Sequence, residues 1–158
     1  MKITVGFDPG KDGGIAIIGD GFITVNALPF DGDELAMSTL VRFIGDHVRA
    51  GDTPLLVIEK VHSMPKQGVV STFTFGSGFG ELKALAKILG HPWELVPPQT
   101  WKKHVLFGTD KSKGGTVEWA IRTYPQLRDH LIKKSGLAHM GKVDALAIAH
   151  YGHHFAKR

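Results

Sequence analysis

The stretch 2–18, KITVGFDPGKDGGIAII, decides the fold of this chain. A first apolar run ends on the acid Asp8, a turn with Pro9 and the pair Gly13-Gly14 follows, and a second apolar run covers 15–18. This pattern predicts a β-hairpin with a carboxylate where its first strand ends. Such a carboxylate can hold a divalent metal or merely cap the turn, and the stretch alone leaves both interpretations open.

Length and composition predict one globular domain that spans 1–158. The 158 residues are enough to bury a core, and a hydrophobic share of 42% without low-complexity runs argues against disorder. The formal charge of +4 suits a polyanionic partner without requiring one. Cysteine is absent, which excludes disulfides and thiolate metal sites.

No membrane association is expected from the sequence. It has no run of 18 uninterrupted apolar residues, and its first residues lack the apolar stretch of a signal peptide. We therefore expect a cytoplasmic protein, either of a bacterium or of a host cell if the chain is encoded by a phage.

The remaining apolar runs predict an α/β fold. Three antiparallel strands open the chain, and two further strands, each preceded by a helix, should be parallel, which gives a five-stranded mixed sheet with helices on both faces. A right-handed crossover places the fourth strand beside the first, so Asp8 and Glu59 should lie at neighbouring strand ends. Asp31-Gly32-Asp33 is expected to cap the first helix. The expected strands are 3–7, 15–18, 22–25, 54–58 and 93–96, and the expected helices are 35–49, 68–90, 99–105, 116–124 and 142–156.

Three acids each begin or end a buried apolar element: Asp8, Glu59 and Asp144. Taken singly, each has an ordinary explanation as a turn acid, a strand-end acid or a helix-start acid. Together they are more specific, because neighbouring buried carboxylates are costly unless a cation or a proton compensates them. Mg²⁺ prefers oxygen ligands, and two such ions would activate a water and stabilise the leaving oxygen in phosphodiester hydrolysis.

Four segments together carry a resemblance to a known family. They are ITVGFDPGKDGGIAII (3–18), VIEKV (57–61), VPPQTWKK (96–103) and KVDALAIAHY (142–151). In order, spacing and local sequence the chain resembles the RuvC family of Holliday junction resolvases, and its short phage-type branch in particular, from 3 to 151. The resemblance implies an RNase H-like fold and a homodimeric endonuclease that nicks two opposed strands of a four-way DNA junction, with two Mg²⁺ ions per site and Mn²⁺ as a substitute.

The resemblance also implies roles for single residues. Asp8, Glu59 and Asp144 match the family's metal-binding acids, and Lys102, after Gln99-Thr100, matches a catalytic basic residue. Lys111 matches a second basic position in the following loop. Lysines near the acids are expected to contact DNA phosphates, and His62 stands where the family often has an aromatic residue that stacks on an unpaired base. The expected DNA contacts are therefore His62, Lys66, Lys102, Lys103, Lys111 and Lys113.

One position departs from the family pattern. Gly141 stands three residues before Asp144, where the family has an acid or a histidine. His139 is the first candidate for the missing metal ligand, although it is equally compatible with a surface loop. With three carboxylates the second Mg²⁺ should be held less firmly, so we expect Gly141→Asp to lower the Mg²⁺ concentration needed for cleavage.

Two other functions remain open at this point. A junction-binding protein without efficient catalysis would fit the missing ligand. A small nucleotide phosphatase of the actin, Hsp70 and sugar kinase type also opens with a strand and an Asp-x-Gly hairpin, but 158 residues leave no room for the second half that this class needs. The glycine-rich, aromatic start of 68–90 is the expected dimer surface, because small residues let a second helix approach closely.

Overall fold

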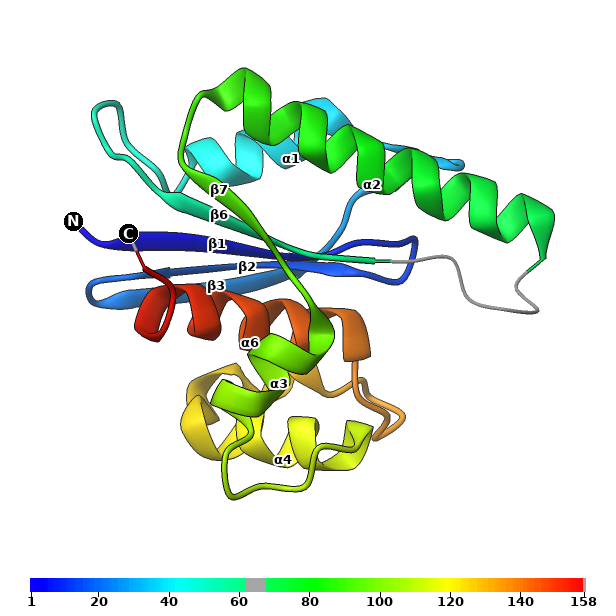
Figure 1. Cartoon of the computed structure of the whole chain (residues 1–158). Helices are drawn as coiled ribbons and strands as arrows, with labels where there is room; N and C mark the ends of the chain where they lie inside the picture. Colours follow the sequence, from blue (N-terminus) through cyan, green and yellow to red (C-terminus); the bar gives the residue numbers. More distant parts are fainter. Residues whose placement is uncertain (62–67, 158) are drawn as a thin grey trace.

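A computed structural model describes residues 1–61 and 68–157 of the chain. Its main sheet has five strands in the order β3-β2-β1-β6-β7, with β1, β2 and β3 antiparallel and β1, β6 and β7 parallel (Figure 1). This arrangement confirms the predicted fold class, including the fourth predicted strand beside the first. The five strands are β1 (Ile3–Asp8), β2 (Gly14–Gly19), β3 (Phe22–Ala27), β6 (Leu55–Glu59) and β7 (Trp93–Val96).

The register of β1 against β6 fixes where two of the acids emerge. Phe7 pairs with Ile58, and the next residue on each strand is Asp8 and Glu59, respectively. Because parallel strands end at the same edge of a sheet, the two carboxylates leave the sheet side by side. On the other side, Asp8 pairs with Gly14 of β2, where the hairpin closes.

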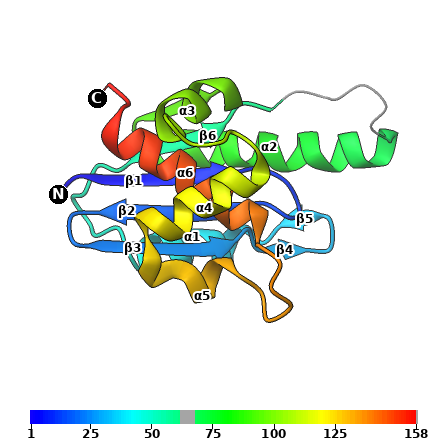
Figure 2. The ribbon, with the colours of Figure 1, turned by 90° about the horizontal axis from the view of Figure 1, so that it is seen from below.

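Helices cover both faces of the sheet, as predicted (Figures 1 and 2). On one face, Ile3, Val5 and Phe7 of β1 pack in a core with residues of the first two helices, and on the other face Ala16 and Val57 pack with the last helix. The first face carries α1 (Met37–Gly45) and α2 (Val69–Leu89). The second face carries α3 (Pro98–Val105), α4 (Lys113–Thr123), the short η1 (Pro125–Leu127) and α5 (Arg128–Leu131), and α6 (Met140–His154).

The segment before α1 differs from the prediction. Asp31-Gly32-Asp33 does not cap a helix but forms the turn of a small hairpin between β4 (Phe30–Asp31) and β5 (Glu34–Leu35). Gly32 has a φ of +63°, a conformation that glycine adopts without strain, and the hairpin pairs Phe30 with the buried Leu35. The helix consequently begins only at Met37 and ends at Gly45, shorter than the predicted 35–49.

Two other helices begin at least two residues earlier than predicted. The α4 helix begins at Lys113 instead of 116, because the hydroxyl of Ser112 accepts a hydrogen bond from the amide of Gly115 and caps it. The α6 helix begins at Met140 instead of 142. This start places Asp144 in the second turn of α6, so the favourable interaction of an acid with a helix N-terminus does not by itself explain its presence.

The α6 helix lies directly on the sheet, with backbone against backbone. A Cβ atom on Gly6 of β1 would lie 2.4 Å from the amide nitrogen of Ala149 and 2.6 Å from the carbonyl oxygen of Ala145. Only glycine permits this approach. The contact positions α6, and with it Asp144, over the strand that carries Asp8.

Within the described ranges, no helix combines the length and the apolar character needed to cross a membrane.

Candidate active site

The structure brings the three predicted acids together at one edge of the sheet. Asp8 ends β1, Glu59 ends β6, and Asp144 lies on α6, which packs against both strands. All three side chains are partly buried. They are close enough for the charge of Glu59 to raise the pKa of both Asp8 and Asp144.

These carboxyl groups hold protons far more tightly than exposed acids do. Burial, followed by the charges of Glu59 and Asp144, raises the pKa of Asp8 from 3.8 to about 9. Burial and the charge of Glu59 raise the pKa of Asp144 to about 6, and burial also raises the pKa of Glu59. The cluster therefore needs a proton or a cation to compensate its charge at neutral pH.

A divalent cation fits this donor set on chemical grounds, since three converging carboxylates offer the oxygen ligands that Mg²⁺ prefers. As the side chains stand, however, no three His, Asp or Glu residues within 1–61 and 68–157 are placed to hold a metal ion together. The assignment of a metal to this site consequently rests on charge and ligand chemistry.

Trp101 is a residue of the site that the sequence analysis missed. Its indole Nε1 donates a hydrogen bond to Oε1 of Glu59 over 2.9 Å, and Trp101, a residue of α3, is fully buried. The hydrogen bond lowers the pKa of Glu59 against the effect of burial. A buried tryptophan N–H usually has a hydrogen-bond partner, which is the signal that could have drawn attention to it.

Lys102 follows Trp101 on α3 and acts on all three acids. Its charge lowers the pKa of Asp8, Glu59 and Asp144, and its Nζ lies 5.2 Å from the centre of the Trp101 ring. A positive charge thus stands beside the three carboxylates.

The other predicted DNA contacts are less close to the acids or lie outside the description. Lys113, the first residue of α4, is exposed, and its charge lowers the pKa of Asp144. Lys103 on α3 and Lys111 before α4 are exposed. His62 and Lys66 lie outside the described residues.

Close packing explains why position 141 is a glycine, which the sequence alone did not reveal. A Cβ atom at this position would lie 2.0 Å from the carbonyl oxygen of Asp12 and 2.6 Å from the carbonyl carbon of Gly13, both in the β1–β2 turn. An acid here would force the turn away from α6. This clash is a steric argument against the expectation that Gly141→Asp improves metal binding.

His139 lies at the start of α6, in a cavity that it shares with Lys133 and Lys142. It is not part of any described group of three side chains that could hold a metal. Burial and the charges of the two lysines lower its pKa.

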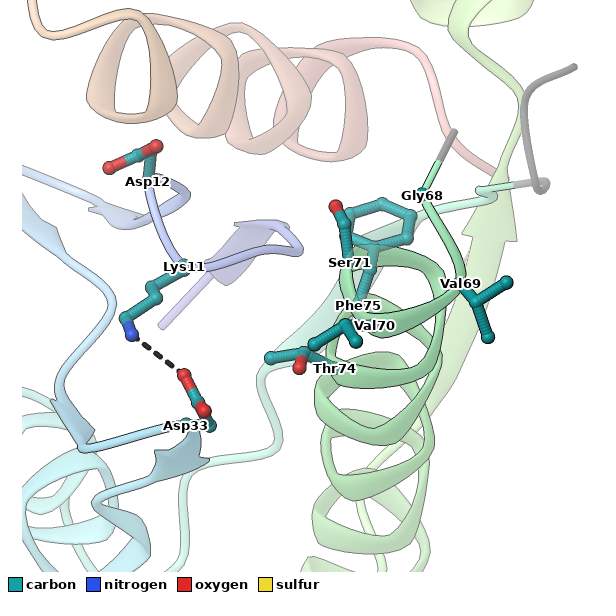
Figure 3. Close-up of a pocket in the computed structure, with 9 residues that line it drawn as sticks. All are labelled: Lys11, Asp12, Asp33, Gly68, Val69, Val70, Ser71, Thr74 and Phe75. Carbon is teal, nitrogen blue, oxygen red and sulfur yellow. Dashed lines mark hydrogen bonds and ion pairs between the residues drawn. The ribbon is translucent and has the colours of Figure 1, made fainter. Parts of the chain in front are cut away.

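A second cavity, of about 670 Å³, lies between the β1–β2 turn, the β4–β5 hairpin and the start of α2 (Figure 3). On the side of the cavity opposite α2, Lys11 and Asp33 form an ion pair of 2.7 Å. Phe75 of α2 lies against the turn, since a Cβ on Gly10 would be 3.1 Å from its ring. Val69 and Val70 line the same cavity. The lining of this cavity is consequently partly charged and partly apolar.

The order of the five strands, with helices on both faces, is that of an RNase H-like fold. No protein-family model and no curated protein matches the sequence, but solved structures do. A Thermus thermophilus RuvC structure in complex with a Holliday junction substrate matches with a TM-score of 0.64 and 15% identity, over 94% of this chain and 90% of that chain. A second Thermus thermophilus RuvC structure matches with a TM-score of 0.56 and 18% identity, over 93% and 90%. The chain has the fold of RuvC over nearly its whole length.

Proposed function

We propose that this protein is a crossover junction endonuclease that hydrolyses phosphodiester bonds in four-way and other branched DNA. The observation that carries the proposal is the triple of partly buried acids at one sheet edge with Lys102 beside them. The fold match to a RuvC that was solved with a Holliday junction substrate supports the choice of DNA. The alternative of a junction-binding protein without catalysis has no comparable support, because binding alone would not need costly buried carboxylates.

Asp8, Glu59 and Asp144 would hold Mg²⁺, or Mn²⁺ in its place, as two ions per site. When bound, the metal activates a water and stabilises the leaving oxygen of the cleaved phosphodiester. The protein itself orients the ligands: Trp101 fixes one oxygen of Glu59, and the packing of α6 on β1 holds Asp144 over Asp8.

Lys102 would stabilise the negative charge that develops on the scissile phosphate. It is well placed for this role because its charge already acts on all three acids. The exposed Lys103, Lys111 and Lys113, together with His62 and Lys66, would contact the DNA arms, which makes binding strongly dependent on salt.

The active form would be a homodimer, because a four-way junction presents two equivalent strands and a two-fold dimer matches that symmetry. The α2 helix extends past the edge of the sheet (Figure 1) and exposes Val69, Val70 and Phe73 by 86%, 78% and 78%. A Cβ on Gly76 or Gly80 would meet no atom within 4 Å, so this surface is also open for close approach. A second copy of the chain is the occupant we assign to it.

Cleavage of a synthetic four-way junction with Mg²⁺ tests the proposal. Wild type should make paired nicks, whereas Asp8→Asn, Glu59→Gln and Asp144→Asn should abolish cleavage and keep DNA binding. Asp129→Asn, an exposed acid on α5, is the matched control and should cleave normally. Binding without cleavage by the wild-type protein in Mg²⁺ and in Mn²⁺ would favour the binding protein, and near-normal turnover of any acid variant would refute the site.

A further inference from the structure

The polar cavity that contains His139 has a volume of about 490 Å³, and Gly141 of its lining lies three residues before Asp144. Four segments line it: the β1–β2 turn with Lys11 and Asp12, the end of β3 at Ala27, the segment between α5 and α6 with Lys133, and the first turn of α6 with Lys142. Gly141 packs tightly against the β1–β2 turn, which follows Asp8 in the sequence. Asp144 lies only one turn further along α6, a rise of about 5 Å.

The charges of this cavity are not balanced. Among the residues that the structure describes, ion pairs join Lys11 to Asp33 and Arg122 to Glu118, so no carboxylate lies within 4 Å of the Lys133 or Lys142 ammonium groups. Asp12 is the acid of the lining, and within 1–61 and 68–157 neither Lys133 nor Lys142 has an ion-pair partner. The lining is therefore positive even when His139 is neutral.

The position of Lys142 is set by the backbone. Its Nζ donates a hydrogen bond to the carbonyl oxygen of His130 over 3.2 Å, which holds the ammonium group without neutralising it. Lys133 and Lys142 both lie close enough to His139 for their charges to lower its pKa. The two lysines thus act on the same small volume, from two different segments of the chain.

We propose that this cavity binds a backbone phosphate of the DNA strand that enters or leaves the acidic site, with Lys133 and Lys142 as its ligands. Phosphates follow one another along a strand at a rise of about 3.4 Å per nucleotide. A phosphate one or two nucleotides from the scissile bond therefore falls within reach of a cavity one helical turn from Asp144. The site would fix the direction of the strand across the acids. This inference rests on the proposed nuclease function for the identity of the strand.

The test measures binding of an uncleaved four-way junction in EDTA as a function of salt. Lys133→Ala and Lys142→Ala should each weaken binding several-fold and reduce the slope of log K against log salt by up to about 0.9, the value for one phosphate contact. Lys134→Ala is the matched control. Lys134 is the next residue in the sequence and is also exposed, but it does not line the cavity. Equal effects of Lys133→Ala and Lys134→Ala would overturn the site.

A second measurement requires neither a four-way junction nor catalysis. Inorganic phosphate and a short single-stranded oligonucleotide are titrated against isotope-labelled protein, and the amide signals of Gly13 and Gly141 are followed. Both ligands should shift these signals in the wild type, and the oligonucleotide should bind more tightly because its other phosphates contact the lysines of α3 and α4. Unchanged signals would refute the phosphate site.

The two proposals fail separately. If the wild type shows the amide shifts, Lys133→Ala loses them, and the wild type never cleaves a junction, the phosphate site is kept and the nuclease function is refuted. Normal cleavage with unchanged slopes in Lys133→Ala and Lys142→Ala would keep the nuclease and refute the phosphate site.

Discussion

The indole nitrogen of Trp101 holds one carboxylate oxygen of Glu59 at 2.9 Å, so a fully buried residue of α3 orients an acid at the end of β6. Trp101→Phe keeps an aromatic ring in place and removes this donor. The variant should cleave about tenfold more slowly, within the cost expected for a lost hydrogen bond to a charged group. Because the hydrogen bond lowers the pKa of Glu59, the acid limb of the pH–rate profile should move to higher pH.

The control for this variant is Trp119→Phe, which changes a buried tryptophan of α4 in the same core. It should lower stability without moving the pH–rate profile. An identical profile for Trp101→Phe and wild type would mean that Trp101 serves only the core.

The stability of the metal-free protein should fall as the pH rises, because of Asp8. The unfolded chain loses this proton near pH 3.8, whereas the folded protein keeps it until about pH 9. Between these two pH values only the folded state carries the proton, so the folded state loses stability relative to the unfolded state as the pH rises. The stability that depends on Asp8 is complete below about pH 3.8 and is lost progressively up to about pH 9. In EDTA, Tm should fall between pH 7.5 and 9 for wild type and clearly less for Asp8→Asn.

Added Mg²⁺ should reverse this trend, since bound metal displaces the proton and its apparent affinity rises with pH. Asp129→Asn serves as the control and should keep the wild-type slope. Parallel Tm curves for wild type and Asp8→Asn would show that the Asp8 carboxyl does not have a raised pKa.

Lys102 and Lys103 are neighbours on α3 and should behave differently. Lys102→Ala should reduce the single-turnover rate by about 100-fold, as expected for the loss of one group that stabilises the transition state, with a much smaller effect on junction affinity. Lys103→Ala should weaken binding modestly and leave the rate at saturating protein unchanged. If Lys102→Ala lost rate and affinity equally, Lys102 would be one phosphate contact among several.

Gly141→Ala should destabilise the protein, because the added methyl group would press on the backbone of the β1–β2 turn. A cost of about 1–3 kcal/mol, or more, is typical of such overpacking. Gly45→Ala is the matched control at the end of α1, where a Cβ meets nothing within 4 Å, and it should be neutral or stabilising. Chemical unfolding of both variants provides the comparison, and an unaffected Gly141→Ala would show that the turn can yield.

The dimer surface can be tested with Phe73→Glu on α2. Sedimentation at micromolar concentration should show a dimer for the wild type and a monomer for the variant. Phe107→Glu changes a phenylalanine of similar exposure, 89% against 78%, beyond the end of α3, and should leave the dimer intact. A monomeric wild type, with and without junction DNA, would contradict this assembly.

The sequence was sufficient to predict what depends on local pattern and simple topology. The hairpin 2–18 could be read from its alternation and glycines, and the crossover rule placed Glu59 beside Asp8. The turn 31–33 was misread because Asp-Gly-Asp suits a helix cap as well as a tight turn, and only the pairing of Phe30 with Leu35 distinguishes them.

Other features could not be predicted because they depend on how distant segments pack. Trp101 and Glu59 are 42 residues apart, and nothing local links them. Gly141 looked like a missing ligand because its neighbour in space, the β1–β2 turn, is invisible in the local sequence. The two lysines of the phosphate cavity likewise meet only after α6 has docked on the sheet.

The backbone contact between Gly6 and α6 also limits how the active site can adjust. With no side chain between helix and strand, α6 cannot slide or tilt without opening a close-packed interface. Asp8 and Asp144 therefore belong to a single rigid unit. Any rearrangement of their oxygens around an arriving cation has to come from rotation about the side-chain torsions, which have only a few allowed values. For the metal binding proposed above, the tolerance of the site for ions of different radius would thus be set by rotamers and not by the mobility of the fold.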